Sequence, residues 1–172
     1  MGASPPGRLV TLPHLMEVGS RRASADDLPV LVDLYRSLEK EMVALHPMWP
    51  LADGQAEPPE DSLARALEDP QTAVYLGTID SVPVGLLLMT VEDLLPQAGG
   101  ARVGAIHLVF VDHEAREIGV GETMRDQALS EHRAMGIRLF DAHVLPGHRL
   151  AKNFFEAGGF AARLIVMHHA DE

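Results

Sequence analysis

The chain has 172 residues, of which 47% are hydrophobic, and it carries a formal net charge of −11 and no cysteine. The absence of cysteine excludes a disulfide framework, a thiolate metal site and a cysteine nucleophile, and no apolar stretch is long enough to span a membrane. The charge argues against a nucleic-acid surface, which needs many lysines and arginines on one face. We therefore expect a cytoplasmic protein that binds neither nucleic acid nor membrane.

The first part of the chain is predicted to contain one strand and two helices. A short strand near Glu17–Ala23 precedes a helix that is capped by Ser24 or Asp26, because apolar residues recur after that point at helical spacing. The segment His46–Pro59 is rich in Pro and Gly and is predicted to be a loop, followed by a short helix over Glu60–Glu68.

The middle of the chain is predicted to form three strands and a helix. Thr72–Ile79 and Pro83–Val91 read as a hairpin, and Arg102–Val111 is apolar on both faces, as a central strand covered by helices should be. A helix begins at Gly119 and ends at Gly136. Its buried residues are expected to be Val120, Met124, Ala128 and Leu129, and its exposed residues Glu122, Arg125, Asp126 and Arg133.

The last part is predicted to contain a strand over Ile137–Val144, a helix over His148–Ala157 and a final strand over Ala162–His168. Residues 1–19 are expected to be an N-terminal tail and lead-in, and residues 20–172 a single domain. Strands and helices in this order predict a mixed α/β fold.

The turn Arg116-Glu-Ile-Gly119-Val-Gly121 lies between the apolar strand and the amphipathic helix. Two glycines remove side chains that would keep an anion away from the backbone, and the first-turn N–H groups of the helix point at it. A P-loop is excluded, because Glu122 and Thr123 follow the second glycine where lysine is required. The dinucleotide fingerprint G-x-G-x-x-G also fails. The sequence therefore predicts a different kind of phosphate-binding turn.

With this turn the chain resembles the GNAT superfamily of acyl-CoA-dependent N-acetyltransferases, which carry [QR]-x-x-G-x-[GA] after a hydrophobic strand. The segment from Val111 to Arg116 is similar to the family's V-x-P-x-x-R, with His113 in place of proline. A second block, from His148 to Phe160, is similar to the family's N-x-x-A-x-x-x-Y-E-x-x-G-F. The resemblance implies a GNAT-like fold: a central, mostly antiparallel sheet with a splayed parallel strand pair and helices on both faces.

The resemblance also implies acetyl-CoA (coenzyme A) as the cofactor. Its diphosphate would lie at the turn, where Arg116 can meet a phosphate. Its pantetheine arm would follow the backbone of the central strand, and the Val111 N–H is a candidate oxyanion donor. The residues expected to contact the cofactor are Val109, Val111, Arg116, Glu117, Ile118, Gly119, Val120, Gly121, Glu122, His148 and Phe155.

Acyl transfer in this family is usually direct, so the acceptor amine must lose a proton to a base. We choose His143 first, because its ordinary pKa suits proton transfer at neutral pH and because the ribosomal-protein alanine acetyltransferases carry a glutamate at a similar place. Asp141 lies on the same strand face and can hold the imidazolium through water. His107 on the central strand is the second candidate. Each histidine can also be a structural residue that bonds a carbonyl group.

Two departures from the family pattern bear on mechanism. Phe155 stands where the family has a tyrosine that protonates the leaving thiolate, and phenylalanine has no proton to give. His148 replaces an asparagine that contacts the cofactor, and it can donate a hydrogen bond or act as an acid. The main hypothesis is an N-acetyltransferase that acts on a primary amine of a small molecule or peptide. The alternatives are a non-catalytic acyl-CoA-binding or regulatory module and a purely structural interaction domain.

The resemblance implies an acceptor site built by the first two helices and the loop between them. That loop contains His46, Pro47, Met48 and Trp49. Its tryptophan can wall an apolar pocket or anchor the loop to the core. Acidic residues that can attract a cationic amine, or form a solvated face, are Glu39, Glu41 and Asp53. No metal site is predicted, because no helical H-x-x-x-H pair is present, and a homodimer through the last strand or its edge is left open.

Overall fold

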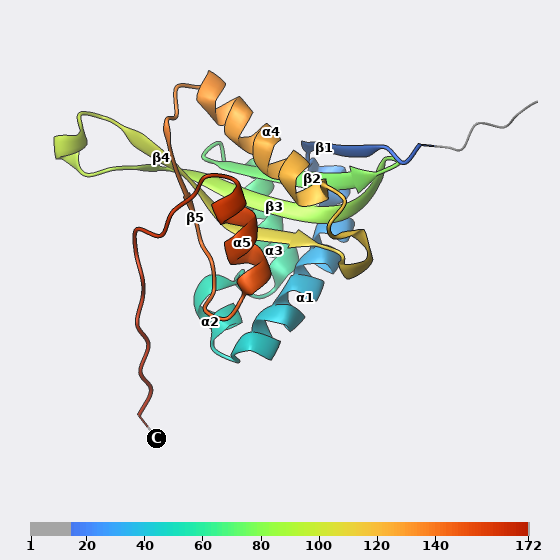
Figure 1. The fold of residues 1–172 in the computed structure, drawn as a ribbon, viewed down its shortest axis with the longest axis horizontal. Helices are drawn as coiled ribbons and strands as arrows, with labels where there is room; N and C mark the ends of the chain where they lie inside the picture. Colours follow the sequence, from blue (N-terminus) through green and yellow to red (C-terminus); the bar gives the residue numbers. More distant parts are fainter. Residues whose placement is uncertain (1–14, 172) are drawn as a thin grey trace, which may run out of the picture.

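The computed structural model describes residues 15–171, and within them a five-stranded sheet is covered by helices (Figure 1). The strands are β1 (Val18–Arg22), β2 (Thr72–Ile79), β3 (Val82–Asp93), β4 (Arg102–Val111) and β5 (Leu139–Ala142). Their order across the sheet is the same as their order in the chain. The first three pairings are antiparallel and the last, β4 with β5, is parallel. Residues 1–14 of the predicted N-terminal tail lie outside the described residues.

The helices connect these strands. They are α1 (Leu28–Leu45), α2 (Trp49–Asp53), α3 (Pro59–Glu68), α4 (Val120–Ala134) and α5 (Arg149–Ala157), with short 3-10 helices η1 (Ala25–Asp27), η2 (Pro96–Ala98) and η3 (His113–Ala115). The Ser24 N–H donates to the Asp27 carboxylate at 2.8 Å, just before α1. Pro29 falls in the first turn of α1, where its missing N–H costs no hydrogen bond. None of the helices in the described part of the chain is both long and apolar enough to cross a membrane.

Apolar cores lie on both faces of the sheet, because successive strand residues point to opposite faces. On one face α1 and α3 cover the sheet; the buried residues there include Leu31, Tyr35, Leu38, Leu63, Leu76, Leu86, Leu88, Leu108 and Phe110. On the other face α4 and α5 cover it; the buried residues there include Tyr75, Leu87, Met89, Ile106, Val120, Met124, Ala128 and Phe155. The predicted mixed α/β class, the mostly antiparallel sheet with a parallel pair, and the helices on both faces are confirmed.

The parallel strands β4 and β5 separate partway along their length. Their last paired residues are Ile106 and Ala142, and the His143 N–H still donates to the Ile106 carbonyl at 2.9 Å. A bulge places His107 as an extra residue between those that pair with β3. From His107 to Val111, β4 continues without β5 beside it, which opens the sheet at this end.

The structure corrects three sequence predictions. Part of the predicted loop His46–Pro59 forms the short helix α2, because Pro50 falls in its first turn, where proline is tolerated. The predicted strand Ile137–Val144 shortens to β5, which pairs only with residues 103–106 of β4. The predicted final strand Ala162–His168 is extended and pairs with no strand among the described residues.

Arg125 was expected on the exposed side of α4 and is instead buried, with 9% of its surface exposed. Its guanidinium lies over the Phe154 ring at 4.8 Å and donates to the Phe154 carbonyl at 3.1 Å. The prediction was wrong because α5 packs on that side of α4.

Candidate active site

The turn before α4 forms an anion-binding nest at the open end of the sheet. Glu117 and Gly119 have positive φ angles of 64° and 96°, which turn successive N–H groups toward one side. Within residues 15–171, no backbone N–H from residue 116 to residue 122 donates to a protein acceptor. A Cβ added at Gly119 would meet no protein atom within 4 Å. These N–H groups and the positive end of the α4 dipole suit a phosphate group.

Gly121 is required for a different reason, the close approach of α5 to α4. A Cβ at Gly121 would lie 3.1 Å from the Phe154 ring and 3.7 Å from a Val111 methyl group. The two glycines of the motif therefore have separate roles, since Gly119 allows the left-handed turn and Gly121 allows the packing beneath it.

Arg116 points away from this nest, toward α1. Its Nε donates to the Val111 carbonyl at 2.8 Å, and its terminal nitrogen pairs with the carboxylate of Glu41. The guanidinium carbon also lies 5.6 Å from the centroid of the Phe110 ring. A contact of this side chain with a diphosphate stays a prediction, and in this structure the arginine charge is already paired with Glu41.

His148 lies at the start of α5, close to the same carboxylate. Its Nε2 is 4.0 Å from the second carboxylate oxygen of Glu41. Burial lowers the pKa of His148, while Glu41 opposes that change and Arg116 adds to it. The imidazole is therefore mainly neutral near neutral pH and can donate one hydrogen bond or accept one. Sequence reasoning did not connect Glu41 with this site, because it lies far away in the chain, on α1.

The remaining predicted cofactor residues differ in accessibility. The Asp112 N–H donates to the Val84 carbonyl on β3. Because successive N–H groups of a strand point to opposite sides, those of Val109 and Val111 point to the side where β5 no longer pairs.

The predicted cofactor residues also differ in side-chain exposure. Phe155 is only 2% exposed and packs against Phe160 in the α4-side core. Its side chain is part of the core and has almost no surface that a ligand could contact. The side chain of Val120 is buried as well, whereas those of Glu117, Ile118 and Glu122 are exposed.

His107 and His143 lie against each other at the point where β4 and β5 separate. Their ring centroids are 4.5 Å apart in an edge-to-face arrangement. The Nε2 atom of His107 is 2.7 Å from the Thr90 hydroxyl and 3.0 Å from the Glu92 carboxylate. Burial lowers the pKa of His107, and His143 lowers it further, while Glu92 raises it. The structure therefore brings both predicted histidines together and adds two residues of β3 that were not predicted.

The predicted link between Asp141 and His143 is not seen. Both oxygens of the Asp141 carboxylate bond to Arg163, with 2.7 Å between Nε and Oδ1. This pairing lowers the pKa of Asp141. The expected water-mediated support of His143 is replaced by an ion pair with the C-terminal part of the chain, 22 residues further on.

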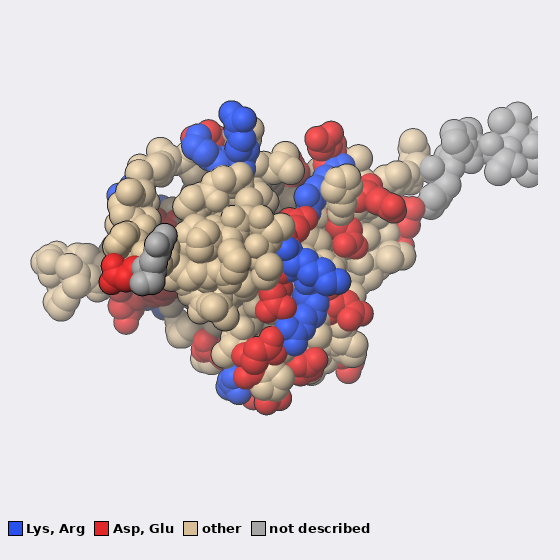
Figure 2. Space-filling model, turned by 90° about the horizontal axis from the view of Figure 1, so that it is seen from below, with Lys and Arg blue, Asp and Glu red and all other residues tan. Residues whose placement is uncertain are grey.

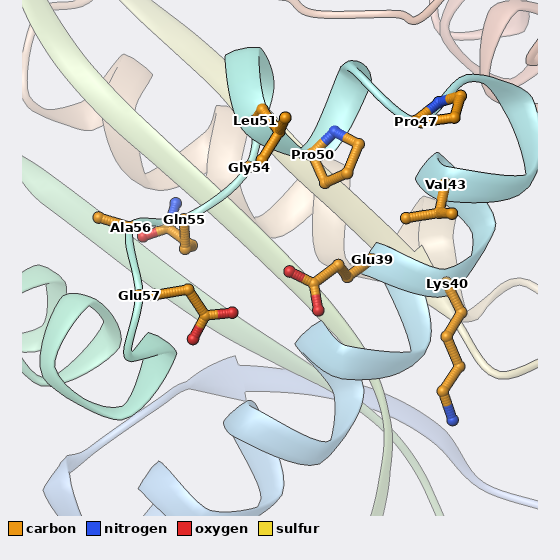
Figure 3. Close-up of a pocket in the computed structure, with 10 residues that line it drawn as sticks. All are labelled: Glu39, Lys40, Val43, Pro47, Pro50, Leu51, Gly54, Gln55, Ala56 and Glu57. Carbon is orange, nitrogen blue, oxygen red and sulfur yellow. The ribbon is translucent and has the colours of Figure 1, made fainter.

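A groove of about 690 Å³ lies between α1, α2 and the segment that leads to α3 (Figure 3). It is lined by Glu39, Lys40, Val43, Pro47, Pro50, Leu51, Gly54, Gln55, Ala56 and Glu57. The carboxylates of Glu39 and Glu57 both pair with Arg36. None of the lining residues belongs to the nest or to the histidine pair.

The loop residues His46 and Trp49 lie outside this groove. Their rings stack at 4.5 Å, and Trp49 packs against the α1-side core. The tryptophan thus anchors the loop, one of its two predicted roles. Within residues 15–171, no three His, Asp or Glu side chains are close enough together to hold a metal ion.

The sequence matches the acetyltransferase (GNAT) family over residues 31–160, well over half of the chain. No curated protein matches it in sequence.

Solved structures with the same fold include three acetyltransferases. An aminoglycoside acetyltransferase from an uncultured soil metagenomic sample, in complex with trehalose, is 17% identical with a TM-score of 0.69, over 90% of this chain and 95% of the other. The ribosomal-protein-alanine N-acetyltransferase of Brucella melitensis biovar Abortus 2308 is 15% identical with a TM-score of 0.68, over 91% and 100%. The aminoglycoside N-acetyltransferase AAC(6')-Iy, in complex with CoA, is 19% identical with a TM-score of 0.68, over 93% and 98%.

Proposed function

Because the chain belongs to the acetyltransferase (GNAT) family, and is therefore an acyltransferase that uses acetyl-CoA, we propose that it transfers an acetyl group directly to a primary amine of a small molecule or peptide. The observation that carries this proposal is the combination of a nest of free N–H groups before α4 with an open β4 edge beside it. We propose the cytoplasm as its compartment, since a chain without cysteine gains nothing from oxidising surroundings.

The residues at the nest fit the cofactor. Backbone N–H groups from Glu117 to Glu122 would hold the diphosphate, and the open space over Gly119 leaves room for it. The N–H groups of Val109 and Val111 would hold the pantetheine arm along β4 in the manner of an added strand. When bound, acetyl-CoA supplies the thioester whose acetyl group the amine accepts.

The histidine pair is proposed to take the proton from the amine. His143 is the proposed base, and His107 is proposed to position it through the ring contact at 4.5 Å. Thr90 and Glu92 of β3 hold His107 in turn, so the proposed base is supported by His107 and, through it, by two side chains of β3. Asp141 is proposed only as an anchor for Arg163.

Two further groups complete the proposed chemistry. The Val111 N–H, on the open side of β4, can donate to the developing oxyanion. The two tyrosines are already engaged, because the Tyr75 hydroxyl donates to Glu131 and the Tyr35 hydroxyl accepts from the Gln55 N–H. We therefore assign the hydrogen bond to the leaving sulfur to His148, the titratable group beside Arg116 and Glu41.

Related folds include acetyltransferases named for aminoglycosides and for a ribosomal-protein alanine. Both kinds of acceptor present a primary amine, which supports a primary amine as the acceptor class here.

The proposal is tested by calorimetric titration with acetyl-CoA, followed by measurement of thiol release over a panel of amines. We expect a Kd on the order of micromolar, lost in Gly119→Trp, whose side chain would fill the nest. Gly99→Trp is the matched control: Gly99 also has a positive φ and open surroundings, so it carries the same backbone strain away from the nest. Thiol release that depends on the amine should fall about 100-fold or more in His143→Ala.

Other outcomes have clear meanings. Absence of binding in the wild type would contradict the proposal. Binding without thiol release for any amine would favour the alternative, a non-catalytic acyl-CoA-binding or regulatory module. Phe155, which has no proton to give and lies in the core, is the observation that keeps this alternative in view.

A further inference from the structure

One carboxylate of α1 lies between two groups at the candidate active site. One oxygen of Glu41 pairs with the guanidinium of Arg116, and the other lies 4.0 Å from Nε2 of His148. The exposed fractions of the three side chains are 32%, 23% and 23%, so all three are partly buried. They come from α1, from the turn before α4 and from the start of α5. This carboxylate therefore connects three elements beside the nest.

The two partners of Glu41 compete for it on unequal terms. Arg116 carries a permanent charge, whereas His148 is a cation only when its imidazole is protonated. The distance of 4.0 Å between Nε2 and the carboxylate is longer than a hydrogen bond. Burial lowers the pKa of His148, Glu41 opposes this change and Arg116 adds to it. In this structure Arg116 therefore holds the carboxylate, and the imidazole beside it is mainly neutral.

Arg116 also lies next to a second possible anionic partner. It directly precedes Glu117, the first residue of the nest that was proposed to hold a diphosphate. Its Nε donates to the Val111 carbonyl at 2.8 Å. The N–H and C=O groups of one strand residue point to the same side, so this carbonyl faces the open side of β4. A guanidinium makes strong paired hydrogen bonds to phosphate oxygens. Arg116 can therefore pair with Glu41 or with a phosphate at the nest.

We propose that Glu41 is a positioning residue shared by Arg116 and His148: when a diphosphate lies at the nest, Arg116 pairs with it and the Glu41 carboxylate moves onto His148. A partly buried carboxylate that has lost its arginine partner is unfavourable, and protonation of His148 gives it a new cation. Nε2–H then donates to Glu41, and Nδ1 keeps a proton for the hydrogen bond that we assign to the leaving sulfur. This inference rests on the function proposed above.

The other charges near His148 do not replace either partner. The groups that act on its imidazole from other elements are Glu41 and Arg116. On α5 itself, Lys152 is exposed and pairs with Glu156 at 2.6 Å. The chain has 25 acidic and 14 basic residues, and Figure 2 shows blue and red side chains lying side by side on the face seen from the end of α1. In such surroundings a basic side chain has several carboxylates to choose from, and an exchange of partners is possible.

NMR titration of the histidine signals in the free protein tests the sharing of Glu41 without any cofactor. The pKa of His148 should rise in Arg116→Gln, because the competing cation is gone, and fall in Glu41→Gln, because the carboxylate is gone. The His148 signal is identified by its absence in His148→Gln. Arg36→Gln is the matched control, because Arg36 also pairs with a glutamate of α1, Glu39, at 2.8 Å, and it should leave the pKa of His148 unchanged.

A pKa of His148 that is the same in the wild type, Arg116→Gln and Glu41→Gln would overturn the proposal. If Arg116→Gln does not fold, the comparison of Glu41→Gln with the wild type decides in its place.

Calorimetric titration with coenzyme A tests the exchange itself. Titrations at about pH 7 in phosphate and in Tris, whose enthalpies of protonation differ, give the number of protons taken up on binding. We expect an uptake of roughly 0.3–0.5 proton per molecule in the wild type. It should fall about twofold or more in Glu41→Gln and stay the same in Glu39→Gln, which removes the same charge from the same helix. The phosphates of coenzyme A can also bind protons, so the difference between the variants is the measure.

The outcomes separate this inference from the proposed function. Absence of coenzyme A binding in the wild type would contradict the proposed function, and the exchange with it. Binding with equal proton uptake in the wild type and in Glu41→Gln would leave the proposed function standing and overturn the exchange alone.

Discussion

Thr90 and Glu92 of β3 hold one ring nitrogen of His107, and the ring of His143 lies against the same imidazole. Burial lowers the pKa of His107 and His143 lowers it further, while the hydrogen bond and negative charge of Glu92 raise it. Glu92 therefore opposes the lowering of the His107 pKa and holds the ring in place. We regard Glu92 as a positioning residue, since it acts through His107.

Glu92→Gln tests this role. Without the carboxylate the pKa of His107 falls further, so a limb of the kcat/KM profile that reports protonation of His107 should move to lower pH. The value of kcat should fall about tenfold, because His107 loses a contact that holds it against His143. Asp93→Asn removes the same charge from the neighbouring strand residue, which points to the opposite face, and should leave the limb in place. If Glu92→Gln lowers kcat but leaves the acidic limb of the kcat/KM profile at the same pH, Glu92 has only a structural role.

Spacing and chemistry predicted His143 and His107 as separate candidates for the base, and the contact between their rings was not predicted. The contacts of Glu92, Glu41 and Arg163 were not predicted, because each of these residues meets a partner from a different element. Asp141 illustrates the difficulty: its strand position was correct, yet its carboxylate bonds to a residue of the C-terminal tail. Periodicity predicts the face of an element on which a side chain lies. It does not predict which residues from distant parts of the chain will contact that face.

Among the elements, α4 and α5 are joined by Arg125. Its guanidinium lies over the Phe154 ring, donates to the Phe154 carbonyl and pairs with Asp126. A Cβ at Gly158 would lie 2.7 Å from its terminal nitrogen, so the end of α5 closes over it. This buried charge therefore links α4, which supports the nest, to α5, which begins after His148, in addition to their apolar packing.

Arg125→Ala should lower the free energy of unfolding by about 1–3 kcal/mol, because the Phe154 carbonyl loses its donor and a buried volume is left empty. Arg133→Ala is the control on the same helix. Arg133 is exposed over Phe140, with its guanidinium carbon 5.5 Å from the ring centroid, so its loss should cost no more than about 0.5 kcal/mol. Urea unfolding measures both, and equal losses would contradict the proposed importance of the α4–α5 contact.

The bounds of β2 and β4 agree with the sequence prediction, because each is a continuous apolar run ended by turn residues. The α2 helix was missed because Pro47, Pro50 and the following Gly54 have the composition of a loop. The final strand, Ala162–His168, was predicted from its composition. Composition shows that a segment can be extended, but it does not show whether another strand is available for hydrogen bonding. Elements whose secondary structure depends mainly on their own residues were therefore predictable. Elements whose secondary structure depends on contact with another segment were not.

At the scale of the whole molecule, three partly or fully buried histidines contribute to the response to acid. Burial lowers the pKa of His107, His132 and His148 from the ordinary value of 6.5. The unfolded chain therefore binds protons at these residues at a higher pH than the folded protein does. The free energy of unfolding is therefore not reduced by these histidines above the pKa that they have in the unfolded chain. It decreases as the pH falls below that value.

The midpoint of thermal unfolding should fall by roughly a few degrees between about pH 7.5 and about pH 5.5, before the carboxylates are protonated. A second loss should begin near pH 4, where Asp27, Asp69 and Asp141, whose pKa values are lowered by their hydrogen-bond partners, start to protonate in the unfolded chain. Scanning calorimetry across this range measures both steps. A midpoint that does not change above pH 5.5 would contradict the histidine contribution.

The order of the strands affects how the chain can fold during its synthesis. Each strand lies next to the one that precedes it in the chain, so β2, β3 and β4 can pair from one continuous stretch with short loops to close. The parallel strand β5 must wait for the α4 crossover. During synthesis on the ribosome, the central meander can therefore form as it emerges, and the nest of N–H groups before α4 is completed only once α4 and α5 have closed over the sheet.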